Sequence, residues 1–151
     1  SAGANLAMAT ALASAPGTFA GLLLFYGIFG FDLDTASYRA YAEGPGLTRA
    51  RMQNLFAMYD PQGRRDGEHL IAPLQSDALG ALPPCCLIAA EHDVLLDDSR
   101  AMAAALRASG VNVDFHIEPG VTHGFINRGR LVPAANASLD RASLFLTGLS
   151  N

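Results

Sequence analysis

Three side chains in this sequence, Ser1, Asp93 and His123, are of the types that perform nucleophilic chemistry on acyl groups. A serine hydroxyl becomes a nucleophile only when a neighbouring base takes its proton. A histidine serves as that base when a carboxylate fixes its tautomer and orientation. The three residues lie far apart along the chain, so their cooperation depends on the elements that surround each of them.

Ser1 opens the segment Ser-Ala-Gly, which leads into an Ala-rich run. A Ser-x-Gly sequence ahead of a helix is the second half of the G-x-S-x-G turn. In that turn, small residues let a strand bend sharply into a helix and leave the hydroxyl exposed. Taken alone the pattern is weak, because serine is also an ordinary N-cap residue of helices.

Asp93 and His123 each follow an apolar run that has the character of a strand. Asp93 comes just after the run Cys85–Ala90, at the end where open α/β sheets place their sites. Asp97 nearby is well placed to cap the next helix, whereas Asp93 lies too early to do so. His123 stands in a glycine-flanked loop, which leaves its ring free to point into a crevice. The chain order of serine, aspartate and histidine is the triad order of the α/β hydrolases.

The elements expected to position these residues alternate between helices and strands. Strands are predicted over three apolar or alternating runs, Gly21–Tyr26, Cys85–Ala90 and Val111–Glu118. Helices are predicted from residue 4 up to the Pro16-Gly17 break, from an N-cap at Thr48 to Met58, from Asp97 to the stop at Gly110, and from Pro133 onward. Residues 60–84 are polar and rich in Gly and Pro, which predicts an irregular connection.

This alternation predicts an α/β fold, with a parallel sheet covered by helices on both faces. Three strands make a thin sheet for such a fold, and the first predicted helix has no strand before it. We therefore expect upstream strands that residues 1–151 do not contain.

Three segments resemble motifs of the bacterial hormone-sensitive-lipase-like esterases, family IV of the α/β-hydrolase superfamily. Residues 1–7, Ser-Ala-Gly-Ala-Asn-Leu-Ala, are similar to the family's G-D-S-A-G-G-N-L-A elbow. Residues 91–98, Glu-His-Asp-Val-Leu-Leu-Asp-Asp, resemble its acid segment, with Val94 at a position where proline is frequent. Residues 118–125, Glu-Pro-Gly-Val-Thr-His-Gly-Phe, resemble its Y-P-G-x-x-H-G-F segment. Residues 32–38 and 82–84 also match in place and spacing, so the similarity spans essentially all 151 residues.

The resemblance implies a carboxylic ester hydrolase that acts on short acyl chains through an acyl-enzyme and needs no cofactor or metal. It assigns Ser1 as the nucleophile, His123 as the general acid/base and Asp93 as the residue that orients the histidine. It leaves the amide of Ala2 as the one oxyanion donor in this chain. Phe125 is a candidate for lining the acyl pocket, with core packing as the alternative.

The resemblance also implies that residues 1–151 form the C-terminal half of a single α/β-hydrolase catalytic domain. The G-D before the serine, the upstream H-G-G-G oxyanion motif and the cap helices are not in the sequence. The alternatives are an incompetent fragment that needs its N-terminal half, or a module that binds a polypeptide through a sheet edge. A further alternative is an N-terminal serine whose own amine acts as the base. Relatives frequently form dimers through the edge strand, so a homodimer through Val111–Glu118 is expected.

The composition excludes several other classes of protein. Half of the residues are apolar and 16% are charged, which excludes intrinsic disorder. The ten basic residues are all arginines, scattered in a chain of formal net charge −4, so no nucleic-acid partner is expected. No apolar run is long enough for a membrane span, and a cytoplasmic location is expected rather than secretion. Cys85 and Cys86 are adjacent and are expected to be buried small side chains, without a disulfide or a zinc site.

Overall fold

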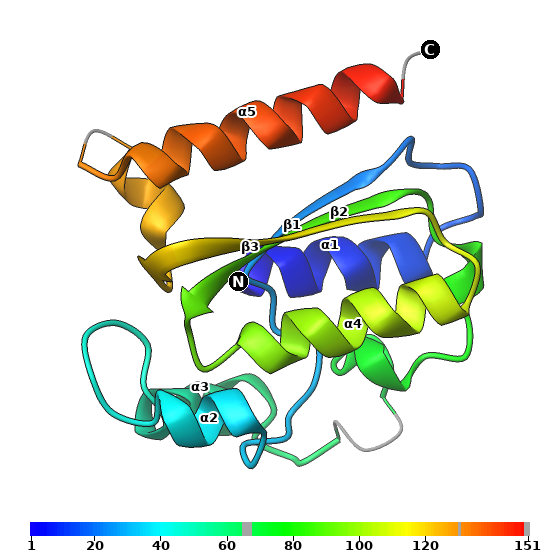
Figure 1. Ribbon diagram of the computed structural model, residues 1–151. Coiled ribbons are helices and arrows are strands. Elements are labelled where there is room, and N and C mark those ends of the chain that lie inside the picture. Colours follow the sequence, from blue (N-terminus) through cyan, green and yellow to red (C-terminus); the bar gives the residue numbers. More distant parts are fainter. Residues whose placement is uncertain (65–67, 130, 150–151) are drawn as a thin grey trace.

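The computed structural model describes residues 1–64, 68–129 and 131–149. It contains a parallel sheet of three strands in the order β1-β2-β3 (Figure 1). The strands are β1 (Leu22–Phe25), β2 (Cys85–His92) and β3 (Val113–Thr122). The α-helices are α1 (Ala2–Leu12), α2 (Ala36–Ala40), α3 (Arg49–Tyr59), α4 (Leu96–Ala108) and α5 (Pro133–Gly148), and short 3-10 turns span Pro73–Gln75, Leu79–Ala81 and Phe125–Arg128.

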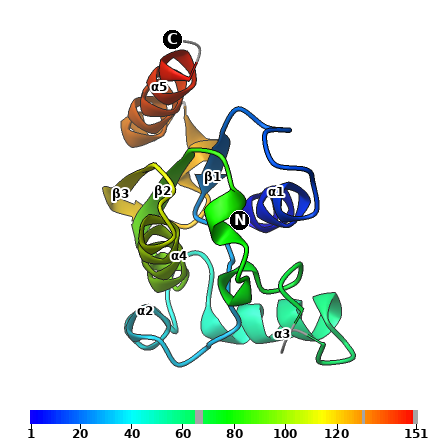
Figure 2. The same ribbon diagram turned by 90° about the vertical axis from the view of Figure 1, so that its right-hand side faces the viewer.

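Helices cover both faces of the sheet, as predicted. Helices α1 and α4 lie on one face and α5 lies on the other (Figures 1 and 2). Neighbouring residues of β2 point to opposite faces, so Leu87 packs in the core beneath α1 and α4 while Ile88 packs in the core beneath α5. A strand buried on both faces must be apolar at every position, which explains the continuous run that predicted it.

The two cysteines fit this arrangement. Cys85 and Cys86 are 0% and 1% exposed and are not joined in a disulfide, which confirms their prediction as buried small side chains. Burial raises the pKa of Cys85 to about 12 and that of Cys86 to about 11. Both thiols are therefore protonated at neutral pH, and neither is a nucleophile that competes with a serine.

Several elements differ from the prediction. Helix α2 was not predicted, and it begins after Thr35, whose hydroxyl accepts a hydrogen bond from the Tyr38 N–H. Strand β3 continues to Thr122 because a bulge accommodates its proline and glycine. The connection over residues 60–84 is irregular apart from its two 3-10 turns, and residues 65–67 lie outside the described part. The N-cap at Thr48 is confirmed, since its hydroxyl accepts from the Arg51 N–H.

The prediction that Asp97 caps the helix after β2 was wrong. Helix α4 begins at Leu96, so Asp97 lies inside its first turn, and the N-cap Leu95 makes no side-chain cap. Within the part of the chain that the structure describes, no helix is both long and apolar enough to cross a membrane.

The side chain of Asp98 in α4 forms hydrogen bonds with the segment that follows β1. One carboxylate oxygen accepts hydrogen bonds from the backbone N–H groups of Phe29 (2.9 Å) and Gly30 (3.0 Å), and Asp98 is only 4% exposed. Burial raises the pKa of Asp98 from 3.8 to about 6, although both N–H donors act in the opposite direction. The contribution of Asp98 to the free energy of unfolding is therefore highest below about pH 4, where its carboxyl is protonated. This stabilisation is lost as the pH rises through about 6, because the buried carboxyl then ionises.

We expect Asp98→Asn to remove this pH dependence while its amide oxygen keeps both backbone hydrogen bonds. The free energy of unfolding of the unsubstituted protein should fall relative to that of the variant between about pH 4 and pH 7, by about 2–3 kcal/mol. Urea unfolding followed by circular dichroism at several pH values measures the difference. The exposed Asp77→Asn is the control, and parallel pH curves for Asp98→Asn and the unsubstituted protein would contradict the assignment.

Candidate active site

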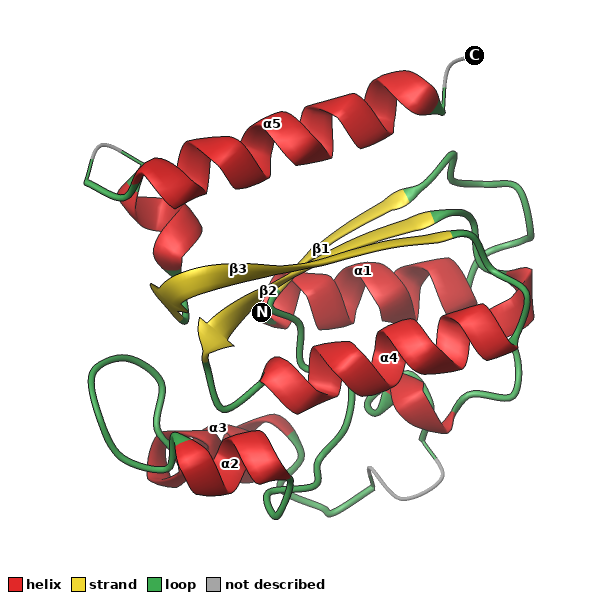
Figure 3. Ribbon diagram, viewed as in Figure 1, coloured by secondary structure: helices red, strands yellow, loops and turns green. Residues whose placement is uncertain are grey.

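The parallel sheet directs the loops after its strands to one edge of the molecule. The pairs Leu22–Cys85 and Cys85–Val113 align the starts of all three strands, so their carboxyl ends emerge together. Open α/β sheets bind ligands at this edge. Asp93 and His123 follow β2 and β3 there, and Ser1 precedes α1 at the same edge (Figure 3).

Ser1 occupies the N-cap position of α1, but its hydroxyl does not cap the helix. The backbone carbonyl of Ser1 accepts the hydrogen bonds from the Ala4 N–H (3.0 Å) and the Asn5 N–H (3.2 Å). The hydroxyl is instead 3.2 Å from Nε2 of His123. Ser1 therefore does not act as an ordinary capping residue, because its side chain contacts His123 and not the helix N–H groups.

Asp93 holds the other side of the same imidazole. Its Oδ2 lies 2.6 Å from Nδ1 of His123, and its Oδ1 accepts a hydrogen bond from the Leu95 N–H at 3.0 Å. Asp93 is 2% exposed, so both hydrogen bonds of its carboxylate are shielded from bulk water. A carboxylate at Nδ1 leaves Nε2 unprotonated and able to take a proton from the hydroxyl of Ser1. The structure thus brings the three predicted residues together in a continuous chain of hydrogen bonds.

A bulge in β3 lies just before His123, whose ring is within hydrogen-bond distance of Ser1 and Asp93. Ala90 pairs with Glu118 and His92 pairs with Thr122, so β3 has three residues where β2 has one. Gly120 takes a φ of +69° in this bulge, and its N–H donates to the carboxylate of Glu91 at 2.8 Å. Most side chains are strained at such a φ. The Pro-Gly pair before His123 therefore has a structural role, which its place in the sequence motif did not indicate.

Tyr26 packs against the imidazole and was not predicted as a site residue. Its ring centroid lies 4.7 Å from that of His123, with 58° between the ring planes, and it makes a T-shaped contact with the ring of Phe125. Tyr26 has a φ of 36°, the one positive value among the described residues that are not glycine. Backbone strain at a non-glycine residue is often associated with function. In sequence, Tyr26 is only the last residue of an apolar run, which gave no signal of this contact.

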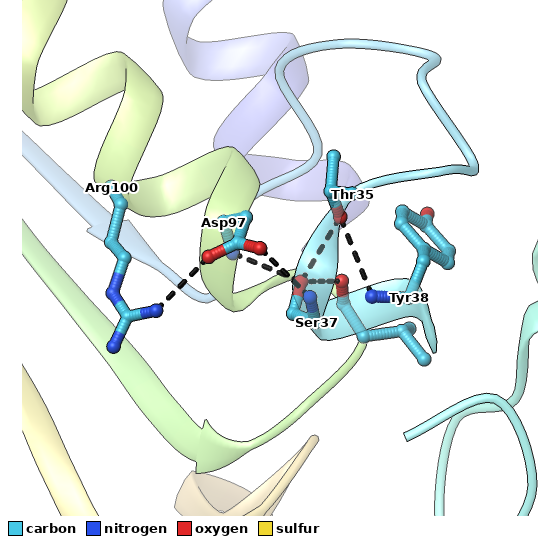
Figure 4. A network of polar contacts seen from close by, with 6 residues as sticks. Thr35, Ser37, Tyr38, Asp97 and Arg100 are labelled. Atoms are coloured by element: carbon cyan, nitrogen blue, oxygen red, sulfur yellow. Dashed lines mark hydrogen bonds and ion pairs between the residues drawn. The ribbon is translucent and has the colours of Figure 1, made fainter. Parts of the chain in front are cut away.

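A polar network fixes the loop that carries Asp93. The Ser37 hydroxyl donates to the carbonyl of Val94 at 2.7 Å, and the Ser37 N–H donates to the carboxylate of Asp97 at 2.8 Å (Figure 4). Burial alone would raise the pKa of Asp97, but the hydrogen bond from Ser37 and the ion pair with Arg100 lower it below its usual value. Helix α2, which was not predicted, is therefore the support for the acid loop.

A cavity of about 490 Å³ opens beside Ser1 and His123. One of its walls is a face of α3 that sequence spacing alone would assign to the core. Leu55 and Tyr59 on this face remain 37% and 51% exposed, so they present apolar surface to the cavity. The side chains on this wall are Arg51, Met52, Leu55, Phe56 and Tyr59.

Phe125, the candidate for lining the acyl pocket, lies in the core, while another phenylalanine lines the cavity. Phe31 lines the cavity. Phe29 and Phe125 are 0% and 2% exposed and pack in the two cores on either side of the sheet. The cavity beside Ser1 is thus lined by residues other than Phe125.

The amide of Ala2 lies at the start of α1, beside the Ser1 hydroxyl. The first N–H groups of a helix have no partner within the helix, and the helix dipole places partial positive charge there. Ala2 also lines the cavity, so its position suits a donor to a developing negative charge. No group of three or more His, Cys, Asp or Glu side chains in the described residues is arranged to hold a metal ion.

Comparison with known proteins agrees with this geometry. The family described as "alpha/beta hydrolase fold" matches residues 1–127. Carboxylesterase NlhH of Mycobacterium tuberculosis is 36% identical over 124 residues, which are 79% of this chain and 38% of that protein. An acetyl esterase of Salmonella choleraesuis is 32% identical over 155 residues, covering 96% of this chain and 46% of its own length.

Two solved structures of esterases share the fold. An esterase of Pseudomonas putida superposes with a TM-score of 0.86 at 31% identity, covering 93% of this chain and 46% of that one. EstE1, a thermostable carboxylesterase from a metagenomic library, superposes with a TM-score of 0.92 at 26% identity over 99% of this chain and 52% of its own. The chain belongs to the α/β hydrolase family, and its relatives confirm the predicted hormone-sensitive-lipase-like group. It spans about half the length of these relatives, consistent with the C-terminal half of the fold.

We expect the contact between Tyr26 and His123 to control how readily the Ser1 hydroxyl reacts. Tyr26→Leu should slow labelling of Ser1 by a fluorophosphonate probe about tenfold, the equivalent of about 1.4 kcal/mol, because the imidazole loses the aromatic ring that holds it. Tyr26→Phe keeps the ring and should restore labelling to within about twofold. Unchanged labelling of a folded Tyr26→Leu protein would contradict this role.

Proposed function

We propose that the protein hydrolyses carboxylic esters, with Ser1 as the nucleophile, His123 as the general acid/base and Asp93 as the residue that orients it. The observation that carries this proposal is the hydrogen-bond chain from the Ser1 hydroxyl through both nitrogens of His123 to Asp93. The names of the relatives, a carboxylesterase and an acetyl esterase, support the reaction type.

The reaction has two halves that use the same imidazole. Oγ of Ser1 attacks the ester carbonyl carbon while Nε2 of His123 takes the hydroxyl proton. The proton then passes to the leaving alkoxide oxygen as the C–O bond of the ester breaks, which releases the alcohol and leaves an acyl-serine. In the second half a water molecule attacks the acyl carbon while Nε2 of His123 takes one of its protons. His123 then gives this proton to Oγ of Ser1 as the acyl–oxygen bond breaks and the carboxylic acid is released.

The negative charge that develops on the carbonyl oxygen needs donors placed in advance. The Ala2 amide is the donor that we propose from this chain, supported by the partial positive charge at the start of α1. A site of this kind gains about 3 kcal/mol from each donor. Because this chain covers only 38% and 46% of the two relatives named above, we propose that a segment outside residues 1–151 supplies the other donors.

The cavity supports short acyl groups as substrates. Its volume of about 490 Å³ lies in the lower half of the usual range for small-molecule sites, and both the acyl and the alcohol parts of the ester must fit in it. The name of the acetyl esterase relative points in the same direction. We also propose that the protein forms a homodimer through β3, which lies at an edge of the sheet in this chain.

Two earlier alternatives receive less support. An N-terminal amine acting as the base would not explain why the Ser1 hydroxyl contacts His123. A polypeptide-binding module without catalysis would not require a buried carboxylate and a histidine beside a free hydroxyl. Ester hydrolysis accounts for all three side chains at once.

We expect Ser1→Ala and His123→Ala each to lower kcat for p-nitrophenyl butyrate by at least about 10⁴-fold, because either change removes proton transfer from the nucleophile. Asp93→Asn should cost about 10²–10⁴-fold, since an amide at this position favours the wrong histidine tautomer. The double variant Ser1→Ala/His123→Ala should be no slower than either single variant, because the two residues act as a unit.

The matched controls are Ser14→Ala, just beyond the end of α1, and His69→Ala in the exposed connection. Both should keep kcat within about twofold. Steady-state kinetics in the full natural protein provides the measurement. Equal turnover in the triad variants and the controls would overturn the proposed function.

A further inference from the structure

The cavity beside Ser1 combines an apolar lining with a single permanently charged side chain. Arg51 lies in the first turn of α3, about one turn before Leu55 and two turns before Tyr59, and all three line the cavity. None of the lining residues is an aspartate or a glutamate. A ligand that fills this cavity therefore meets apolar carbon along most of its length and a guanidinium at one place.

The guanidinium of Arg51 has no partner in the described part of the chain. The backbone N–H of Arg51 donates to the Thr48 hydroxyl, a contact that does not involve the side chain. Its neighbour Arg49 behaves differently, because its side chain pairs with the carboxylate of Asp34. Arginine is used where a carboxylate or phosphate must be bound by two parallel N–H donors, and none of the guanidinium donors of Arg51 is engaged by the described residues.

The overall charge of the chain makes this local feature more informative. The formal net charge is −4, so the protein as a whole does not attract anions. An anion that enters the cavity must be held by a nearby positive group, and Arg51 is placed to be that group. An ester with a purely apolar substituent would fit the remaining lining but would leave the guanidinium without a role.

We propose that the ester bound in this cavity carries a carboxylate that Arg51 binds, as in a monoester of a short dicarboxylic acid. This inference rests on the proposed ester hydrolysis and specifies its substrate class. The reacting carbonyl lies at Ser1, a short methylene chain follows the apolar wall of α3, and the carboxylate reaches Arg51. Arg51 acts in binding and does not touch the reacting atoms.

The test compares an anionic ester with a neutral ester of similar size in the full natural protein. For a charge on the acyl side, the pair is mono-p-nitrophenyl glutarate and p-nitrophenyl valerate. For a charge on the alcohol side, it is the butyrate ester of 3-hydroxypropanoic acid and propyl butyrate. We expect kcat/KM to favour the anionic member of one pair by about tenfold, the effect of one charge-assisted contact.

Arg51→Gln should lower this preference about tenfold, with the loss in KM rather than in kcat, because uniform binding is what the substitution removes. Arg49→Gln, two residues away on the same helix, should leave the preference unchanged. Raising the ionic strength to about 0.5 M should weaken the preference in the unsubstituted protein, since salt screens an exposed charge. Binding of glutarate to the Ser1→Ala variant, measured by calorimetry, should weaken by the same factor when Arg51→Gln is added.

The outcomes separate the two proposals. If Ser1→Ala hydrolyses the neutral esters as fast as the unsubstituted protein, the proposed function itself fails. If hydrolysis requires Ser1 but neither pair shows a preference, the assignment of Arg51 fails while the esterase function stands. The same holds if Arg49→Gln changes the preference as much as Arg51→Gln, because the effect would then be one of general charge.

Discussion

The parallel pairing of β2 with both of its neighbours is the constraint on which the rest of this structure depends. Because β1 and β3 run in the same direction as β2, the segments that follow all three strands emerge at one edge. Parallel strands require crossover helices, and those helices bury both faces of the sheet. The buried faces leave the carboxyl edge as the place where polar side chains can meet. Asp93, His123 and the start of α1 are neighbours for this reason, although they are far apart in sequence.

The sheet brings the residues to one edge, and smaller irregular features set the distances between them. The bulge in β3 adds residues ahead of His123, and the positive φ of Tyr26 turns an aromatic ring against the imidazole. Ser37 holds the turn after β2 through its hydroxyl and its N–H. Each feature departs from regular geometry and lies close to the hydrogen-bond chain. A hydrogen bond of 2.6 Å between Asp93 and His123 tolerates little displacement, so regular strands alone would not be sufficient.

The sequence predicted what repeats along the chain and what motifs mark directly. Continuous or alternating apolar runs predicted all three strands, and the order of serine, aspartate and histidine predicted three residues that the structure brings within hydrogen-bond distance. Helix α2 was missed because its five residues are too few to show a period and its start depends on a single hydroxyl at Thr35. Asp97 was taken for a cap because local rules favour acidic residues at helix starts, while its carboxylate binds Arg100 and the N–H of Ser37, which is sixty residues away. Tyr26 and Asp98 were missed for the same reason, since each acts through contacts with residues distant in sequence.

Several features around the site lower the free energy of unfolding. An ionised Asp98 in the interior, a tyrosine at positive φ and an apolar face of α3 left partly exposed each lower the free energy of unfolding. All three border the same region. Asp98 holds the segment after β1 that lines the cavity, Tyr26 contacts the histidine, and α3 forms the wall. A fold selected for stability alone would have replaced Asp98 by an apolar residue. The concentration of these costs around one cavity is a physical argument that supports the proposed active site.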